Sequence, residues 1–267
     1  MPGKKLNRNT NQKSVSRGVQ SIEVGSRLLY TLLREEEPMM LKDLAQISGF
    51  SPAQAHAYLA SYRKIGLVEQ NEASGRYRLG KFALDCSIAA MQTTDPMDLA
   101  NDFVRDLSEN TALNVALVVW GSFGPTVISV KESGRQLNMN TKTGTVYSMT
   151  GTASGRIFTA FLPEQIAKDA IAREKREVVG SGRVGQPCFM SKVALDTIRE
   201  QGYSTVEDPP VPGISAYAAP VFDYTGQIVM AITIIGMDNY LEPRAKNEFI
   251  PALLDTTAKL STELGYI

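Results

Sequence analysis

The chain has few of the side chains on which enzyme chemistry usually depends. Its 267 residues include one histidine, His56, and two cysteines, Cys86 and Cys188, with no CxxC. A serine hydrolase needs a nucleophile, a base and a group that orients the base, but the single histidine lies near the N-terminal end. No GxSxG, no phosphate-binding GxxxxGK[ST] and no metal-ligand spacing occurs. We therefore expect no enzyme activity, no cofactor and no metal site.

Side chains around residue 56 are typical of a nucleic-acid-binding surface. In a helix-turn-helix, the second helix enters the major groove and contacts bases from its N-terminal half. The segment 52–64 suits such a helix, with Ala55, Leu59 and Tyr62 on its inner face. Basic residues that follow it suit phosphates, which fix register without reading sequence. The predicted DNA contacts are Ala53, Gln54, His56, Ala57, Arg63, Lys64, Arg76 and Arg78.

Several of these residues have two interpretations. Gln54 can pair with adenine, or it can serve a capping box at the start of its helix. His56 can contact DNA or be an ordinary surface histidine. Arg76 and Arg78 flank Tyr77 and so point to one side of a strand, where each binds phosphate or remains a solvated charge.

Three helices and a hairpin have to position these residues. Leu44, Ala45 and Ile47 are expected on the inner face of a short helix, and Ser51 followed by Pro52 predicts a helix start. The expected helices and strands cover 19–34, 41–48, 52–64, 66–70 and 76–79. This order is that of a winged helix-turn-helix domain, expected over 19–80, after a disordered basic tail over 1–18.

The rest of the chain predicts a second domain. A mostly apolar helical linker is expected over 81–95, and Asp95-Pro96 is a helix-start pair. Further helices are predicted at 96–110, 152–161, 163–172, 191–201 and 250–264, and strands at 114–120, 125–132, 136–141, 214–223 and 227–235. Strands before and after a block of helices favour an α+β domain with a mainly antiparallel sheet, expected over 96–267.

The charge distribution separates the two domains. The 28 basic and 28 acidic residues give a formal net charge of zero. Residues 1–80 hold 12 basic and 7 acidic residues, a net charge of +5, and the remainder therefore carries −5. A phosphate backbone attracts the first part and repels the second. The alternative is a chance division of surface charge.

Composition also bears on the compartment. The most apolar stretch, Ile228 to Gly236, is shorter than the roughly 20 residues that a membrane span needs. The basic N-terminus has no apolar core of a secretion signal. Two widely separated cysteines suit a reducing compartment. We therefore expect a cytoplasmic protein with no membrane partner.

The sequence resembles the IclR-type transcriptional regulators over about Val19 to Tyr266. In the N-terminal part the resemblance rests on Leu41-Lys42-Asp43-Leu44-Ala45, Gly49-Phe50, Ala55-His56-Ala57-Tyr58-Leu59, Gly66-Leu67-Val68-Glu69 and Arg76-Tyr77-Arg78-Leu79-Gly80. In the C-terminal part it rests on Thr152-Ala153-Ser154-Gly155-Arg156, Ile198-Arg199-Glu200-Gln201-Gly202-Tyr203, Gly213-Ile214-Ser215-Ala216-Tyr217-Ala218-Ala219-Pro220-Val221 and Leu260-Ser261-Thr262-Glu263-Leu264-Gly265-Tyr266.

The resemblance implies a GAF-like effector-binding domain, a homodimer or homotetramer, and binding to palindromic double-stranded DNA. It also implies that a small organic ligand binds in the C-terminal domain. Carried over, the effector-binding residues are Tyr147, Ser148, Met149, Ala153, Ser154, Gly155, Ile214, Ala216, Thr233 and Ile235, with Glu207 in the acidic segment before the Gly213 strand.

Physical reasoning supports part of this assignment. Free backbone N–H groups at a helix N-terminus bind anions, and the small residues Ala153 to Gly155 allow close approach. The alternative is that they only permit tight packing. Ile214 and Ala216 share one strand face, but an apolar face is also what a core needs. The segment 209–212 reads as a stiff loop near the pocket, either a lid or a plain connector.

Three positions depart from the family pattern. Ala57 stands where many relatives carry Arg, Ala216 where Cys is common, and Ile235 where a polar residue is usual. A less polar pocket favours a carboxylate ligand with an apolar or aromatic body. Two other functions stay open: a DNA-binding protein without an effector, and, more remotely, an enzyme with a fused DNA-binding module, whose acid–base pair would be Glu207-Asp208.

Overall fold

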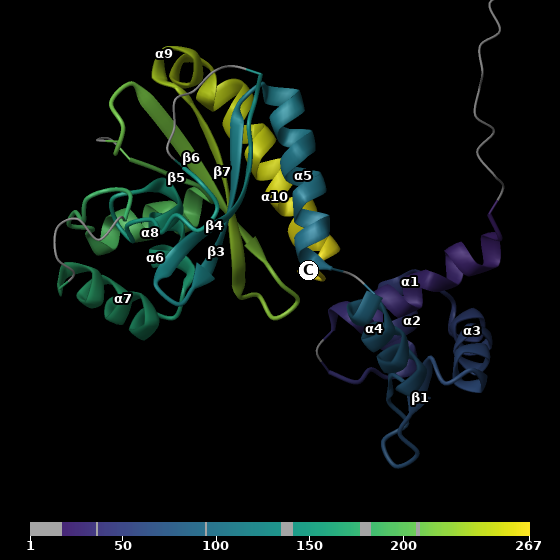
Figure 1. Cartoon of the computed structure of the whole chain (residues 1–267). Helices are drawn as coiled ribbons and strands as arrows, with labels where there is room; N and C mark the ends of the chain where they lie inside the picture. Colours follow the sequence, from purple (N-terminus) through teal and green to yellow (C-terminus); the bar gives the residue numbers. More distant parts are fainter. Residues whose placement is uncertain (1–17, 36, 94, 135–140, 177–182, 207–208) are drawn as a thin grey trace, which may run out of the picture. The chain divides into compact units, whose positions relative to one another are not determined.

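The structure, a computed structural model, describes residues 18–35, 37–93, 95–134, 141–176, 183–206 and 209–267. The chain divides into two compact units between residues 93 and 94, and each unit has a hydrophobic core. Figure 1 shows the order of elements within each unit. All but the last residue of the expected tail 1–18, most of the expected strand 136–141, and Glu207 lie outside the described residues.

The N-terminal unit is a winged helix-turn-helix, as predicted. Its elements are α1 (Gln20–Arg34), α2 (Leu41–Ser48), α3 (Pro52–Lys64), β1 (Val68–Gln70), β2 (Tyr77–Leu79) and α4 (Lys81–Thr93). The two strands pair antiparallel, with Glu69 opposite Arg78. Leu28, Leu44 and Leu59 bring the first three helices into one core. The helix α4, which covers most of the expected linker, belongs to this unit.

One core prediction in this unit is wrong. Ile47 was expected on the inner face of α2, but its side chain is 58% exposed. The buried residues of α2 are Leu44, Ala45 and Ser48. Ser48 lies one turn beyond Leu44 and donates its hydroxyl to the Leu44 carbonyl, so a polar residue occupies the inner position and Ile47 falls outside the stripe.

The C-terminal unit is built on one five-stranded sheet. Its strand order is β4-β3-β7-β6-β5, and every neighbouring pair is antiparallel. The strands are β3 (Asn114–Gly121), β4 (Gly124–Lys131), β5 (Ser204–Thr205), β6 (Ile214–Phe222) and β7 (Ile228–Met237). The helices are α5 (Pro96–Thr111), α6 (Ala153–Phe161), α7 (Glu164–Arg176), α8 (Lys192–Gln201), α9 (Asp238–Leu241) and α10 (Ile250–Glu263). The predicted α+β class and the antiparallel sheet are confirmed.

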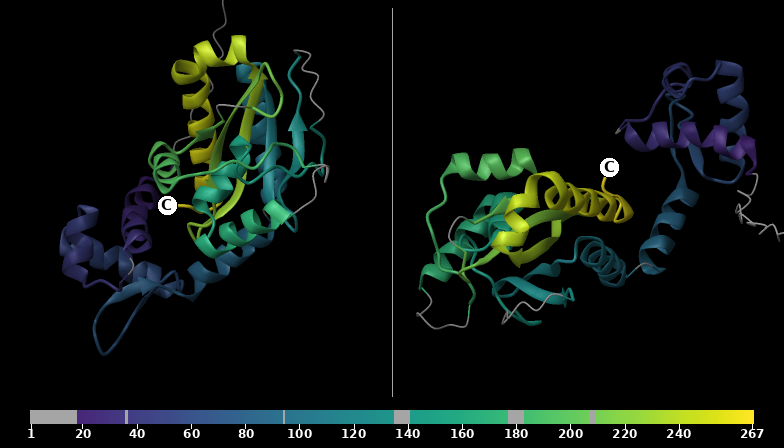
Figure 2. Two further views of the ribbon diagram at one scale, coloured as in Figure 1. Left: turned by 90° about the vertical axis from the view of Figure 1, so that its left-hand side faces the viewer. Right: turned by 90° about the horizontal axis from the view of Figure 1, so that it is seen from above.

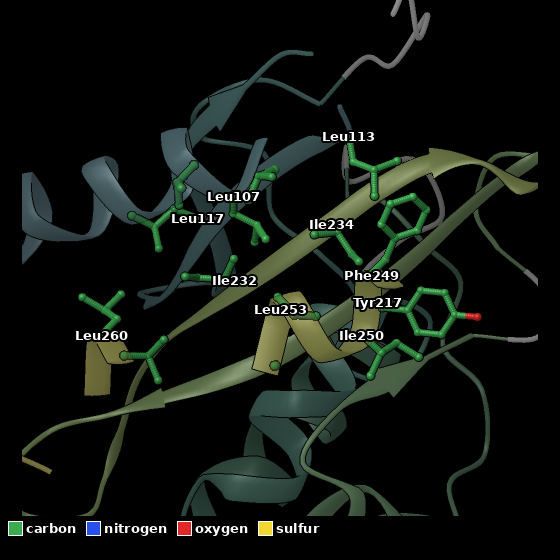
Figure 3. Packing of buried hydrophobic residues seen from close by; sticks show 14 of the residues in the cluster. Leu107, Leu113, Leu117, Tyr217, Ile232, Ile234, Phe249, Ile250, Leu253 and Leu260 are labelled. Atoms are coloured by element: carbon green, nitrogen blue, oxygen red, sulfur yellow. The ribbon is translucent and has the colours of Figure 1, made fainter. Parts of the chain in front are cut away.

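Helices cover both faces of this sheet (Figure 2). On one face, α5 and α10 pack on β3 and β7 through Leu107, Leu117, Ile232 and Leu253, which Figure 3 shows converging. On the other face, α6 packs through Ile157 and its neighbours. Because both faces are covered, the central strand β7 is apolar through most of its length.

Two features of this unit had no expectation in the sequence. The strand β5 has two residues, too few for a hydrophobic period, and Ser204 Oγ fixes it by donating to the Ala153 carbonyl at 2.6 Å. Between α9 and α10 the chain passes through a short 3₁₀ helix, η1 (Glu242–Arg244), and a π-helical turn, η2 (Ala245–Phe249). The strand β5 pairs with β6, and Ala245 and Phe249 of η2 are buried in the core.

Within the described ranges, no helix combines the length and apolar character needed to cross a membrane.

The start of α3 yields a stability prediction. Ser51 Oγ accepts a hydrogen bond from the Gln54 amide, completing a capping box. Ser51→Ala should therefore lower the local free energy of unfolding by about 1 kcal/mol, measured as faster hydrogen exchange of the α3 amides. Ser51→Asp keeps a cap acceptor and should lose less; equal losses in the two variants would contradict the role of the cap.

Candidate nucleic-acid interface and ligand pocket

The outer face of α3 carries the residues predicted to contact DNA. Ala53, His56 and Ala57 are exposed there, while Ala55 and Leu59 are buried beneath them. The helix therefore presents small side chains and one imidazole on the side away from the core. This arrangement allows a close approach to base edges in a major groove.

Gln54 lies on this face, but its side chain is engaged at the start of the helix. Its Oε1 accepts from the Ser51 amide at 3.2 Å and from Ser51 Oγ at 3.0 Å. Of the two interpretations of Gln54, the capping role is the one present in this structure. A bidentate contact with adenine would require the box to open, although the Nε2 protons play no part in the box.

The basic residues near α3 lie on the surface, and three of them contact their own domain. Arg63 Nη1 donates to Gln70 Oε1 at 2.9 Å, and Arg76 Nη1 donates to the Pro38 carbonyl at 2.8 Å. Arg78 Nη2 lies 3.1 Å from Glu69 Oε2. Exposed contacts of this kind contribute little to stability, so phosphate can replace them. Lys64 is exposed at the end of α3.

A pocket in the C-terminal unit brings together most of the predicted effector residues. It has an empty volume of about 480 Å³, part of it open to solvent. The start of α6, strands β6 and β7, the segment around Tyr147 and the loop after β5 enclose it. The predicted residues in its wall are Tyr147, Ala153, Ser154, Ile214, Ala216, Thr233 and Ile235.

Strand register places the sheet residues of the pocket side by side. Ala216 of β6 lies opposite Ile235 of β7, and Ala218 lies opposite Thr233. The first turn of α6 meets this wall where the hydroxyls of Ser154 and Thr233 are 2.8 Å apart. Both residues are at least 98% buried. The pair is therefore a polar point between the apolar side chains of Ala153, Ala216 and Ile235.

Three predicted effector residues support the pocket from behind and do not line it. Ser148 Oγ accepts from the Gly151 amide at 2.9 Å, and the Met149 amide donates to Glu174 Oε2 at 2.9 Å. Gly155 packs on this same turn, because a Cβ atom there would overlap the Ser148 carbonyl oxygen. For Gly155, tight packing is thus the interpretation that the structure supports.

The described lining has no charged side chain. Its residues are of seven types: Thr, Tyr, Ala, Ser, Val, Ile and Pro. Thr152 caps α6 by accepting from the Gly155 amide at 3.0 Å, whereas the first two amides of a helix, here those of Ala153 and Ser154, have no intrahelical partner. These amides and the partial positive charge of the helix end can bind an anionic or polar group.

Tyr147 adds a second polar group to the wall. Burial raises the pKa of its phenol above the usual value, so the hydroxyl stays protonated. It donates to Thr141 Oγ1 at 3.4 Å. The pocket thus combines an apolar interior with hydroxyl groups and helix-end amides, which suits a small organic ligand with a polar end.

Some of the residues that line the pocket were not among the effector residues predicted from the sequence. Pro209, Pro210 and Val211 belong to the segment that the proline pattern indicated. No local sequence pattern indicated Thr141 or Val184, because long-range contacts bring these residues to the pocket. Val184 reaches it through a β-bridge to Tyr147. The remaining members are Thr152 and Val206. Within the described ranges, no cluster of three or more potential metal ligands occurs.

Two family models match the chain. The one described as "IclR helix-turn-helix domain" matches residues 21–72. The one described as "Bacterial transcriptional regulator IclR C-terminal" matches residues 88–262.

Individual proteins match over nearly the whole length. The chain is 28% identical to the glycerol operon regulatory protein of Streptomyces griseus, over 94% of this chain and 98% of that protein. It is 26% identical to the protein of that name from Streptomyces coelicolor, with the same coverage. The crystal structure of HmgR from Pseudomonas aeruginosa superposes with a TM-score of 0.79, at 28% identity, over 93% of this chain and 99% of that one.

The contact of Gly155 with the turn behind it yields a prediction. Gly155→Ala should destabilise the C-terminal unit by about 3 kcal/mol, because the neighbouring atom is backbone and cannot rotate away. Thermal unfolding measures the effect. The control is Gly134→Ala, where nothing lies within 4 Å of the new Cβ atom; an equal loss in the control would disprove the steric argument.

Proposed function

Because this chain belongs to the IclR family of transcriptional regulators, we propose that it is a ligand-responsive regulator that binds a palindromic promoter site and senses a small organic acid. The chain is a DNA-binding regulator and not an enzyme, since both family models and the relatives describe transcriptional regulators. Because such a protein acts on the chromosome of its cell, we place it in the cytoplasm.

The observation that carries the sensing proposal is the pocket at the start of α6. The amides of Ala153 and Ser154, which have no intrahelical partner, the Ser154–Thr233 hydroxyl pair and the Tyr147 phenol are polar groups around an apolar interior. A carboxylate at the helix end gains from the helix dipole by about 0.3–1 kcal/mol. An apolar or aromatic body contacts Ile214, Ala216 and Ile235, and gains about 25 cal/mol for each Å² buried.

Exposed apolar residues support a homo-oligomer. Helix α4 leaves Phe82 46%, Leu84 59% and Ile88 45% exposed, and a second copy of the chain can bury these side chains. A twofold dimer presents two copies of α3, and for this reason we propose that the operator is palindromic. A homodimer, or a homotetramer made from two dimers, satisfies this requirement.

The winged-helix unit supplies the proposed contacts with the operator. His56, flanked by the exposed Ala53 and Ala57, is the proposed base contact of α3, and Gln54 joins it if its capping box opens. The phosphate contacts come from Arg63, Lys64, Arg76 and Arg78.

Calorimetric titration tests the sensing proposal. Aromatic and longer aliphatic monocarboxylates should bind and raise the melting temperature of the full chain. Thr233→Val, which removes one hydroxyl at constant shape, should weaken binding about tenfold by a loss near 1.4 kcal/mol. Thr225→Val, at an exposed turn, is the control. If only short hydroxy or keto acids bind, the proposal of a ligand with an apolar body is rejected. If no metabolite raises the melting temperature, the result favours a regulator without an effector.

DNA titrations at several salt concentrations test the interface. The double variant Arg76→Ala/Arg78→Ala should bind every DNA sequence more weakly and lower the salt slope by about one for each lost phosphate contact. His56→Ala should instead change the preference among operator sequences. Unchanged affinity in the arginine double variant would reject the assignment of the wing.

A further inference from the structure

Three successive backbone amides at the start of α4 donate to residues of β1 or of the turn just before it; β1 and β2 together form the wing of this unit. Gly80 N donates to the Leu67 carbonyl at 2.9 Å, and Phe82 N donates to the Gly66 carbonyl at 3.0 Å. Between them, Lys81 N donates to a side chain, Glu69 Oε1, at 3.2 Å. The first amides of a helix lack intrahelical partners, so Glu69 satisfies one that would otherwise face solvent.

The second oxygen of the same carboxylate holds a wing arginine. Glu69 Oε2 lies 3.1 Å from Arg78 Nη2, and the two residues lie directly opposite in the β1–β2 pair. One carboxylate of β1 therefore contacts both Arg78 of β2 and the first turn of α4.

Close packing restricts where this carboxylate can be. Gly80 is buried, and a Cβ atom there would overlap the Gly66 carbonyl and lie 3.1 Å from Glu69 Cγ. The side chain of Glu69 thus passes over a backbone with no room for a larger residue. Although its side chain is 44% exposed, its base is fixed against the junction between β2 and α4.

We propose that Glu69 is a positioning residue with two roles. Its carboxylate keeps Arg78 from binding DNA until a phosphate replaces the carboxylate as the partner of Arg78, and it connects the wing to α4. The proposal rests on the proposed contact between Arg78 and phosphate. When Arg78 moves to a phosphate, the freed carboxylate keeps the Lys81 amide, where the positive end of the helix stabilises it. Glu69 therefore lowers DNA affinity and preserves the geometry of the junction.

Glu69→Gln separates the two roles, because glutamine keeps an acceptor for the Lys81 amide but loses the charge. Exposed ion pairs of this kind contribute about 0.2–1 kcal/mol, so DNA affinity should rise up to about fivefold at low salt. The gain should shrink at higher salt, where the pair is already screened. Glu72→Gln is the matched control: it removes one acidic charge from the exposed hairpin tip.

A double-variant cycle distinguishes the possible failures. In an Arg78→Ala background, Glu69→Gln should no longer raise affinity. If Arg78→Ala weakens binding but Glu69→Gln has no more effect than Glu72→Gln, the positioning role is wrong and the phosphate contact stands. If Arg78→Ala has no effect, the phosphate contact itself is wrong.

Hydrogen exchange at the Lys81 amide tests the connection to α4 without DNA. Exchange should be faster in Glu69→Ala and unchanged in Glu69→Gln, because only alanine removes the acceptor. Equal protection of this amide in the wild type and in Glu69→Ala would overturn this part of the proposal.

Discussion

The close contact between the first turn of α6 and the turn that precedes it determines where this helix packs on the sheet of the C-terminal unit. Gly155 meets the Ser148 carbonyl with no space for a side chain, and Ser154 meets Thr233 of the central strand β7. The start of α6 is thereby held against the sheet at one position along β7. Because Ala153 and Ser154 of this turn line the pocket, a packing constraint between small residues fixes the position of the helix end at which we propose that the ligand's polar group binds.

Local signals in the sequence were sufficient for much of the fold. Alternating and helical apolar patterns predicted every helix of eight residues or more that the structure describes, and the Ser51–Gln54 capping box formed as expected. The pattern failed where long-range contacts decide the outcome. The two-residue strand β5 is defined by its pairing with β6 and is held to α6 by the bond from Ser204 to Ala153. Ile47 is exposed because Ser48 takes the inner position of a short helix.

The sites were predictable to different extents for the same reason. Ala153 and Ser154 carry a helix-start signal, and the strand register then brings Ala216 and Ile235 to them. No local pattern indicates Val184 or Thr141, which reach the pocket only through tertiary folding. The basic residues of the winged helix could be recognised as a group, but their partners within the domain, such as Glu69 for Arg78, depend on strand pairing that composition does not encode.

The uncharged lining of the pocket has a consequence for selectivity in a cell. A phosphate ester or a dicarboxylate would bring two negative charges into a wall whose described side chains have no positive charge to neutralise them. Desolvating such ions without a counter-charge is very costly, whereas a single carboxylate can be accommodated at the helix end. The most abundant phosphorylated intermediates of metabolism would therefore compete poorly for the proposed site, and the regulator could respond to a scarce ligand against a high background of multiply charged ones.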